Sequence, residues 1–202
     1  KTRATRDGDH YILNGEKTSA SFGAQAEVAT VFAKTDPKAG ARGVTCFLVP
    51  LDLPGIERSV LPHTGLKGVG AASIIFDGVR IPAKYRCGEE GKGFYMAMGG
   101  LEFMRSCLAL MNLGAAQISL EETISYVKER KAFGKPLGKF EGVSFKLAED
   151  AALIDAARLL CYRALWLMDQ GEPNTKEVAM SKWFGPRVSV RVIHDCMLLH
   201  GH

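Results

Sequence analysis

The sequence predicts an α+β protein in which a small antiparallel β-barrel or sandwich is followed by an antiparallel helical bundle. Two observations predict this class. Short β-branched and aromatic runs fill residues 1 to about 82, and from about residue 93 apolar residues recur every three or four positions. Strands and helices are thus segregated along the chain, which favours an α+β architecture over alternating βαβ units. We place a β-domain at residues 1–87 and an incomplete helical bundle at residues 88–202.

The first half contains several short candidate strands separated by Gly and Pro clusters. Strand-like runs occupy residues 10–21, 27–35, 43–50 and 72–82. Asn14-Gly15 divides the first of these runs and is the strongest short hairpin signal in a sequence. We therefore predict a hairpin turn at Asn14-Gly15.

The second half predicts three long helices, at residues 94–130, 142–171 and 172–201. Phe133-Gly134 and Pro136 end the first helix, because Pro cannot continue it simply. Gly171 is predicted to cap the second helix. Asn174, three residues before Glu177, resembles a capping box for the third.

Composition excludes several classes of function. The chain has 202 residues, a formal net charge of +4 and no apolar run long enough to span a bilayer. This mild charge, without an Arg-rich stripe, does not indicate nucleic-acid binding. No secretory signal opens the chain, and five scattered cysteines favour free thiols over a disulfide or metal framework. The first residue is Lys and the last lies in an apolar run, so we expect a segment of a longer polypeptide.

A cluster of cations surrounds the break after the first helix: Lys128, Arg130, Lys131, Lys135 and Lys139. Such a cluster is either a solvated helix end or a site for an anionic ligand. The glycines at residues 88–93 have GxxGxG spacing and no βαβ unit around them, so they do not indicate a dinucleotide-binding loop.

Several motifs occur in the order typical of one family. They are YILNGEK, AEVATVFAKTD, RGVTCFLVP, LKGVGAASIIFDGVRIP, GEEGKGF, YVKERKAFGKPLGKFEGVSFKLAE and LLHGH. With these motifs the chain resembles an acyl-CoA dehydrogenase over essentially its whole length. The resemblance implies most of a middle β-domain and three helices of a C-terminal four-helix bundle.

The resemblance also implies a chemistry. Members of this family bind FAD and an acyl-CoA substrate, and a carboxylate removes the α-proton while the β-hydrogen leaves as a hydride to the flavin. Electrons then pass to an electron-transferring flavoprotein. The family implies a homotetramer built as a dimer of dimers, in the bacterial cytoplasm or the mitochondrial matrix.

The resemblance assigns one group of cofactor contacts to the cation cluster. Arg130 would contact the FAD pyrophosphate of a neighbouring subunit, because a guanidinium can bond two oxygens at once. Phe133 would pack beside the cofactor. Phe140 and Glu141 fall where the family often has a Gln near FAD, so an identical contact is not expected from Glu141.

A second group of cofactor contacts comes from both ends of the chain. Ser19, Ala20 and Ser21 replace the family's Trp-Ile-Thr segment beside the flavin ring, and the Ser21 hydroxyl can serve as the Thr hydroxyl does. The alternative for them is an ordinary β-strand. Gly201 and His202 fall on a Gly-Gly turn near FAD.

The resemblance assigns Glu102, Phe103, Met104 and Arg105 to the CoA and acyl site. An intrahelical ion pair of Glu102 with Arg105 is the alternative. In one branch of the family the catalytic Glu occupies the position of Met104, which cannot take a proton. Glu102 points about 200° away from Met104 round the helix, so we expect the base beyond residue 202. We expect no metal site.

The departures from the family pattern at Ser19–Ser21, in LKGVGAAS and at HGH resemble the subgroup that oxidises alicyclic thioesters such as cyclohexanecarboxyl-CoA. Loss of the Trp beside the flavin would give a rigid ring more room. Two alternatives remain: an acyl-CoA oxidase-like enzyme that uses O2, and a non-catalytic scaffold that binds flavin or CoA.

Overall fold

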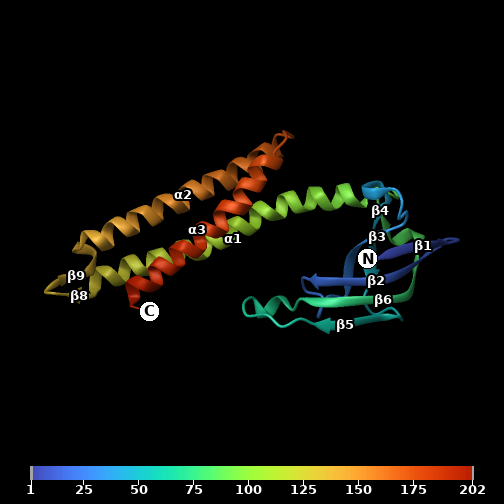
Figure 1. Cartoon of the computed structure of the whole chain (residues 1–202), viewed down its shortest axis with the longest axis horizontal. Coiled ribbons are helices and arrows are strands. Elements are labelled where there is room, and N and C mark those ends of the chain that lie inside the picture. Colours follow the sequence, from blue (N-terminus) through green and yellow to red (C-terminus); the bar gives the residue numbers. More distant parts are fainter. Residues whose placement is uncertain (1, 202) are drawn as a thin grey trace. The chain divides into compact units, whose positions relative to one another are not determined.

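The structure, a computed structural model, describes residues 2–201 of the chain. It divides into two compact units, Lys1–Gly99 and Gly100–His202. Figure 1 shows a β-sheet in the first unit and long helices in the second. The predicted α+β class is therefore confirmed.

The first unit is built around a seven-stranded sheet with the order β5-β6-β2-β1-β3-β4-β7. Its strands are β1 (Arg3–Asp7), β2 (His10–Ala20), β3 (Val28–Lys34), β4 (Val44–Pro50), β5 (Ile56–Val60), β6 (Ala72–Pro82) and β7 (Arg86–Cys87). All of these pairings are antiparallel except β1 with β3. Since β5 and β7 lie at the two edges of this order, the pairings among the described residues do not close a barrel.

One face of this sheet carries the core of the first unit. Tyr11, Leu13, Phe47, Val49 and Val79 are fully buried there. They alternate with more exposed residues along their strands, as expected where one face of a sheet is covered. The rings of Tyr11 and Phe47 meet edge to face at 4.9 Å.

The predicted hairpin at Asn14-Gly15 is wrong. The chain turns earlier, at Gly8, where Asp7 of β1 pairs with His10 of β2. Asn14 and Gly15 continue β2, which pairs with strands on both sides. A register shift between Leu13 and Gly15 marks a bulge, and Gly15 takes a φ of 124° there. Pairing with two neighbouring strands outweighs the local turn preference.

Three helices make up most of the second unit: α1 (Gly93–Glu129), α2 (Glu141–Asp169) and α3 (Thr175–His200). α1 begins in the first unit. The core of the bundle includes Leu113, Leu120, Ile154, Val188 and Val192. These positions recur every three or four residues along each helix, which is the spacing that predicted the helices.

Helices α1 and α3 approach closely at two small residues. A β-carbon added to Gly185 of α3 would lie 2.9 Å from the β-carbon of Ala109 on α1. Nearby, the buried hydroxyls of Ser106 and Ser181 are 3.1 Å apart and share a hydrogen bond. The contact therefore depends on the absence of a side chain at Gly185.

The end of α2 and the start of α3 fall close to their predicted positions. Gly171 has a φ of 71°, the left-handed geometry expected just after a helix. Asn174 precedes α3 but makes no side-chain cap, so the predicted capping box is wrong. Its amide instead donates to the carbonyl of Ala164 on α2, at 3.0 Å. The Asn174 side chain is therefore hydrogen-bonded to α2 and not to the first turn of α3, where the local sequence had placed it.

A buried carboxyl group lies between α2 and α3. Asp150 is fully buried, and neither of its oxygens has a hydrogen-bond partner among the described residues. Burial and the nearby charge of Asp195 raise its pKa to about 6, against the opposing effect of Lys146 and Arg191. Lys146 pairs with Asp195 at 2.6 Å. A buried acid of this kind makes stability depend on pH.

Among residues 2–201, no helix combines the length and the apolar character needed to cross a membrane.

Candidate functional site

The predicted anion site at the end of α1 is a short, tight hairpin. Strands β8 (Lys131–Ala132) and β9 (Lys135–Pro136) pair across the two residues Phe133 and Gly134. Both of these residues have positive φ, 50° and 78°, as the turn of a two-residue hairpin requires. A φ above zero is rare for an aromatic residue. The fold therefore holds Phe133 in an unfavourable backbone conformation.

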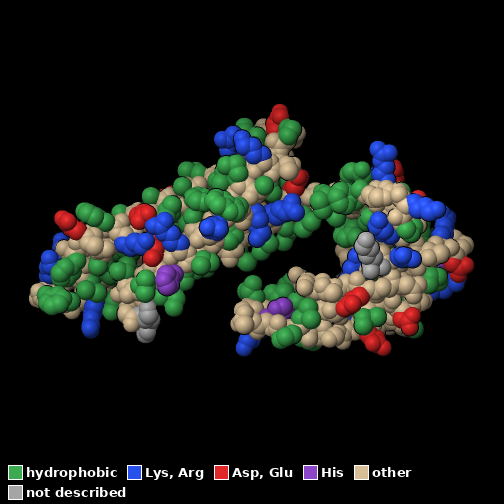
Figure 2. All heavy atoms as spheres, in the orientation of Figure 1, with side chains coloured by type: hydrophobic (Ala, Val, Ile, Leu, Met, Phe, Trp, Pro, Cys, Tyr) green, Lys and Arg blue, Asp and Glu red, His purple; other side chains and the backbone are tan. Residues whose placement is uncertain are grey.

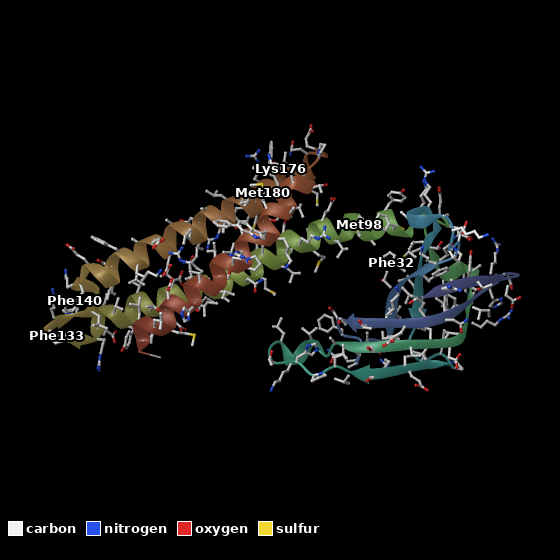
Figure 3. The ribbon with its side chains drawn as sticks, in the orientation of Figure 1. Phe32, Met98, Phe133, Phe140, Lys176 and Met180 are labelled. Atoms are coloured by element: carbon white, nitrogen blue, oxygen red, sulfur yellow. The ribbon has the colours of Figure 1, made fainter. Side chains whose placement is uncertain are left out.

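This hairpin presents Phe133 to solvent. Phe133 is 98% exposed, and its ring meets Phe140 edge to face at 6.5 Å. Figure 3 labels both residues at the hairpin end of the helical unit. The ammonium of Lys135 lies 4.2 Å from the ring centroid of Phe140, a cation–π contact.

Arg130 is fixed at the base of the hairpin through its backbone. Its N–H donates to the backbone carbonyl of Tyr126 at 2.8 Å, and its carbonyl accepts from the N–H of Leu137 at 2.8 Å. Its side chain is exposed and forms no salt bridge within the described part of the chain. The guanidinium is thus available to an anion.

Glu141 is the first residue of α2 and is exposed. A carboxylate is favourable at this end of a helix because the N-terminus carries partial positive charge. The position therefore has a structural explanation that does not require a ligand.

The end of α3 lies against the last turns of α1. The ring of His200 stacks on Tyr126 at 4.2 Å, and its Nε2 is 3.3 Å from the hydroxyl of Thr123. Gly201 follows in the left-handed conformation, with a φ of 94°. Gly201 is thereby brought near the hairpin, since Tyr126 lies one turn before Arg130. The sequence did not single out Thr123 or Tyr126. His202 lies outside the described residues.

A small cavity of about 230 Å³ opens at this junction. Side chains of α1 and α3 line it, namely Ser119, Glu122, Thr123, Ile193, Cys196, Met197 and His200.

Ser19, Ala20 and Ser21 lie at the irregular end of β2 in the first unit. The register with β6 shifts between Lys17 and Ala20, and Ser19 takes a positive φ of 53°. Ser19 and Ser21 are exposed, so their hydroxyls are available for hydrogen bonds. Ser19 and Ala20 thus form an irregular end of strand β2, as part of the strand that was the alternative, and Ser21 lies just beyond it.

The loop after Ser21 is held by contacts that the sequence did not reveal. Phe22 has a positive φ of 58° and is 53% exposed, and its N–H donates to Val69 at 2.9 Å. The guanidinium of Arg58 donates to the carbonyl of Ala26 at 2.9 Å and lies 3.5 Å from two other loop carbonyls. The contact of Arg58 with this loop could not be predicted from local sequence. The two are far apart along the chain, and only the folded sheet brings them together.

The predicted substrate residues lie together on α1. Phe103 and Met104 are each 49% exposed. Glu102 accepts a hydrogen bond of 2.7 Å from the hydroxyl of Thr175 at the start of α3. The alternative of an ion pair with Arg105 is not observed among the described residues. Glu102 thus already has a partner within the bundle.

Among residues 2–201, no group of three or more His, Cys, Asp or Glu side chains is placed to hold a metal ion.

Comparison with known proteins gives the family. The model of the acyl-CoA dehydrogenase middle domain matches residues 1–79, and that of the C-terminal domain matches residues 91–202. Neither match tests the boundary that we place after residue 87, which stays a prediction.

Individual proteins agree. The chain is 37% identical over 201 residues to caffeyl-CoA reductase-Etf complex subunit CarC of Acetobacterium woodii, covering 99% of this chain and 53% of that protein. It is 37% identical over 201 residues to the mitochondrial short-chain specific acyl-CoA dehydrogenase of Mus musculus, covering 99% and 49%. The structure of butyryl-CoA dehydrogenase from Megasphaera elsdenii matches with a TM-score of 0.94 at 36% identity, covering 100% and 53%.

The chain spans about half the length of the curated relatives it matches. The two domain models match residues 1–79 and 91–202, and the structural match covers the whole chain. The chain therefore belongs to the acyl-CoA dehydrogenase family.

Proposed function

We propose that the full-length protein is an FAD-dependent enzyme that removes the α- and β-hydrogens of an acyl-CoA thioester. The observation that carries the proposal is the exposed hairpin of Arg130 and Phe133, found in a chain of this family. A bundle that needed this hairpin only for stability would have no reason to expose an aromatic ring on a strained turn.

The residues present fit FAD by the chemistry of their donors. The Arg130 guanidinium is exposed, unpaired among the described residues and suited to two pyrophosphate oxygens. Phe133 offers an apolar face beside it. In the first unit, the exposed Ser21 hydroxyl can hydrogen-bond a flavin ring. When bound, FAD would supply the hydride acceptor.

Other predicted cofactor contacts differ in how well they fit. Gly201 leaves room for a close backbone approach, because it has no side chain. Phe140 supports Phe133 through their ring contact rather than by reaching outward. Glu141 would repel a pyrophosphate if it approached one, so we assign it to stabilising the start of α2.

The residues on α1 fit a role in binding substrate rather than in removing a proton. Met104 has no group that accepts a proton, and Glu102 is bonded to Thr175. We therefore place the base in the part of the full-length protein beyond residue 202. Phe103 and Met104 would contact the acyl group through their exposed side chains.

We further propose an alicyclic acyl group, because Ser19 is small where the family carries Trp. The test compares kcat/KM of the full-length enzyme for cyclohexanecarboxyl-CoA, butyryl-CoA and octanoyl-CoA. We expect the cyclic thioester to have the highest kcat/KM of the three. Ser19→Asn adds volume with a residue that tolerates positive φ, and it should reduce this preference, whereas Ser19→Ala should keep it. Faster turnover of both straight chains by the unmodified enzyme would refute the alicyclic assignment alone.

An electron-transferring flavoprotein is the proposed acceptor. The name of the Acetobacterium relative places that protein in a complex with Etf. The test measures substrate-dependent reduction of added electron-transferring flavoprotein, with oxygen consumption recorded in parallel. Rapid oxygen consumption without an acceptor protein would instead identify an oxidase.

A homo-oligomer is the proposed assembly. Apolar side chains remain exposed along all three helices, and Figure 2 shows apolar groups spread over the surface of the helical unit. The largest include Met111, Ile118, Leu159, Trp166, Trp183 and Val190. Exposed apolar surface on this scale is typical of interfaces, so it supports contact with a further helix or with other subunits.

A further inference from the structure

Two cysteines face each other across the edge of the sheet. Cys46 of β4 and Cys87 of β7 are direct partners in the antiparallel register, and both are free thiols. Residues in such positions carry their side chains on the same face of a sheet. The two thiols are far apart in sequence, so only the fold brings them together.

The spacing of such a pair permits a covalent bond. Opposed residues of antiparallel strands have α-carbons about 4.5 or 5.5 Å apart, according to the type of pair. Disulfides form when this distance is about 4.4–6.8 Å. Either type of pair therefore lies within reach, with no movement of the strands relative to one another.

The two thiols differ in their access to solvent. Cys46 is 2% exposed, whereas Cys87 is partly exposed. Burial raises the pKa of Cys46 to about 11, and the adjacent Cys87 adds to the shift through its charge and a hydrogen bond. A buried thiol with a raised pKa is a poor first target for an oxidant. Cys87 is therefore the thiol that an oxidant would meet first.

The remaining three cysteines lie in the second unit. Cys107, Cys161 and Cys196 lie on three different helices of the second unit. Cys161 and Cys196 are buried, and Cys107 is partly exposed. Cys107 therefore serves as a control with similar access to solvent.

We propose that Cys46 and Cys87 form a redox-active dithiol that a peroxide converts to a cross-strand disulfide. The Cys87 sulfur attacks the peroxide, whose O–O bond breaks to give a sulfenic acid and, from hydrogen peroxide, water. The Cys46 sulfur then attacks the Cys87 sulfur, the S–O bond breaks, and the hydroxyl leaves as a second water with the Cys46 proton. The two thiols are oxidised by two electrons, and the peroxide is reduced.

The bond would fasten a weakly held part of the first unit. Strand β7 has only two residues, lies at the edge of the sheet and pairs only with β4. A few residues later α1 begins at Gly93, where an added β-carbon would lie 2.7 Å from the Cys46 nitrogen. The disulfide would thus tie the entry of α1 to β4, and a cross-link of this kind stabilises mainly by restricting the unfolded chain.

The test uses the full-length protein treated with hydrogen peroxide close to one equivalent, followed by alkylation and intact mass measurement. We expect the protein to lose the mass of two hydrogen atoms and to have two fewer alkylated thiols. A cross-linked peptide containing Cys46 and Cys87 should also be found. Dithiothreitol should reverse all three changes, and the melting temperature should rise by several degrees on oxidation.

Variants make the assignment specific. Cys87→Ser should abolish the mass loss, and Cys46→Ser should leave Cys87 as a sulfenic acid that dimedone traps. Cys107→Ser should behave as the unmodified protein. Circular dichroism checks that each variant is folded. Persistence of the mass loss in folded Cys87→Ser, or direct passage of Cys87 to sulfinic acid in the unmodified protein, would overturn the proposal.

Discussion

Phe133 and Phe140 meet edge to face at 6.5 Å, yet 98% of Phe133 remains exposed. The contact orients Phe133 without burying it. Phe133 also has a positive φ of 50°. Glycine adopts this backbone conformation at lower energetic cost than phenylalanine does.

This relationship predicts separate effects on stability and on cofactor binding. Phe133→Gly should leave the melting temperature unchanged or slightly higher, since it relieves the backbone and removes no buried contact. It should weaken FAD retention about tenfold, or roughly 1.4 kcal/mol, as measured by flavin fluorescence on dilution. Tyr162→Ala, which removes an exposed aromatic from α2, is the control. Equal FAD loss in both variants would count against a contact made by Phe133.

The hydrogen bond of Thr175 to Glu102 predicts that Glu102 is not the catalytic base. Glu102→Gln keeps an acceptor for the Thr175 hydroxyl, so the rate of flavin reduction by substrate should change less than about tenfold. Loss of a true base would cost about 10²–10⁴-fold or more. Thr175→Val should lower stability, and a double-mutant cycle should show coupling between the two positions. A collapse of the rate in folded Glu102→Gln would contradict this assignment.

Asp150 predicts a pH dependence of stability. Its pKa is raised from 3.8 to about 6 in the folded state, so the folded state binds the proton more tightly than the unfolded state does. Its ionisation therefore destabilises the fold fully above pH 6, and this effect fades as the pH falls through 6 towards 4. Full ionisation costs on the order of 2–3 kcal/mol.

Asp150→Asn removes this ionisation. The variant should gain stability relative to the unmodified protein as the pH rises from 4.5 to about 7.5. Denaturant unfolding at several pH values measures the difference, and Asp155→Asn, at an exposed position on α2, controls for general charge effects. Parallel pH profiles of the Asp150→Asn and unmodified proteins would show that Asp150 does not titrate as described.

The close approach of Gly185 to Ala109 predicts a position that cannot accept a side chain. Gly185→Val should destabilise the protein by about 1–3 kcal/mol, because the helices must separate. Gly114→Val is a matched control, since Gly114 lies on α1 with no atom near its added β-carbon. It should be nearly neutral in a thermal or denaturant unfolding experiment. Similar losses at both positions would indicate a general effect of valine in these helices.

The sequence predicted those elements whose pattern extends over many residues. The strands at Val28–Lys34, Val44–Pro50 and Ala72–Pro82 and the helix α1 lie close to their predicted positions, because burial of one face imposes a regular spacing. The hairpin predicted at Asn14-Gly15 was wrong, because pairing of β2 with strands on both sides outweighed the local turn preference.

The structure brings predicted site residues together where they are also neighbours in sequence. Arg130, Phe133 and Phe140 fall on one hairpin and its flank. The positive φ of Phe133, the Arg58 contacts to the Ser21 loop and the pairing of Cys46 with Cys87 depend on the tertiary fold. No local pattern encodes them.

Flavin-dependent dehydrogenation is tested by the absorbance spectrum of the purified full-length protein before and after addition of acyl-CoA without oxygen. We expect an oxidised flavin whose long-wavelength band bleaches with cyclohexanecarboxyl-CoA and is restored by electron-transferring flavoprotein. A flavin that stays oxidised with cyclic and straight-chain thioesters alike would contradict dehydrogenation. A protein that takes up no flavin on reconstitution would contradict the role given to Arg130 and Phe133.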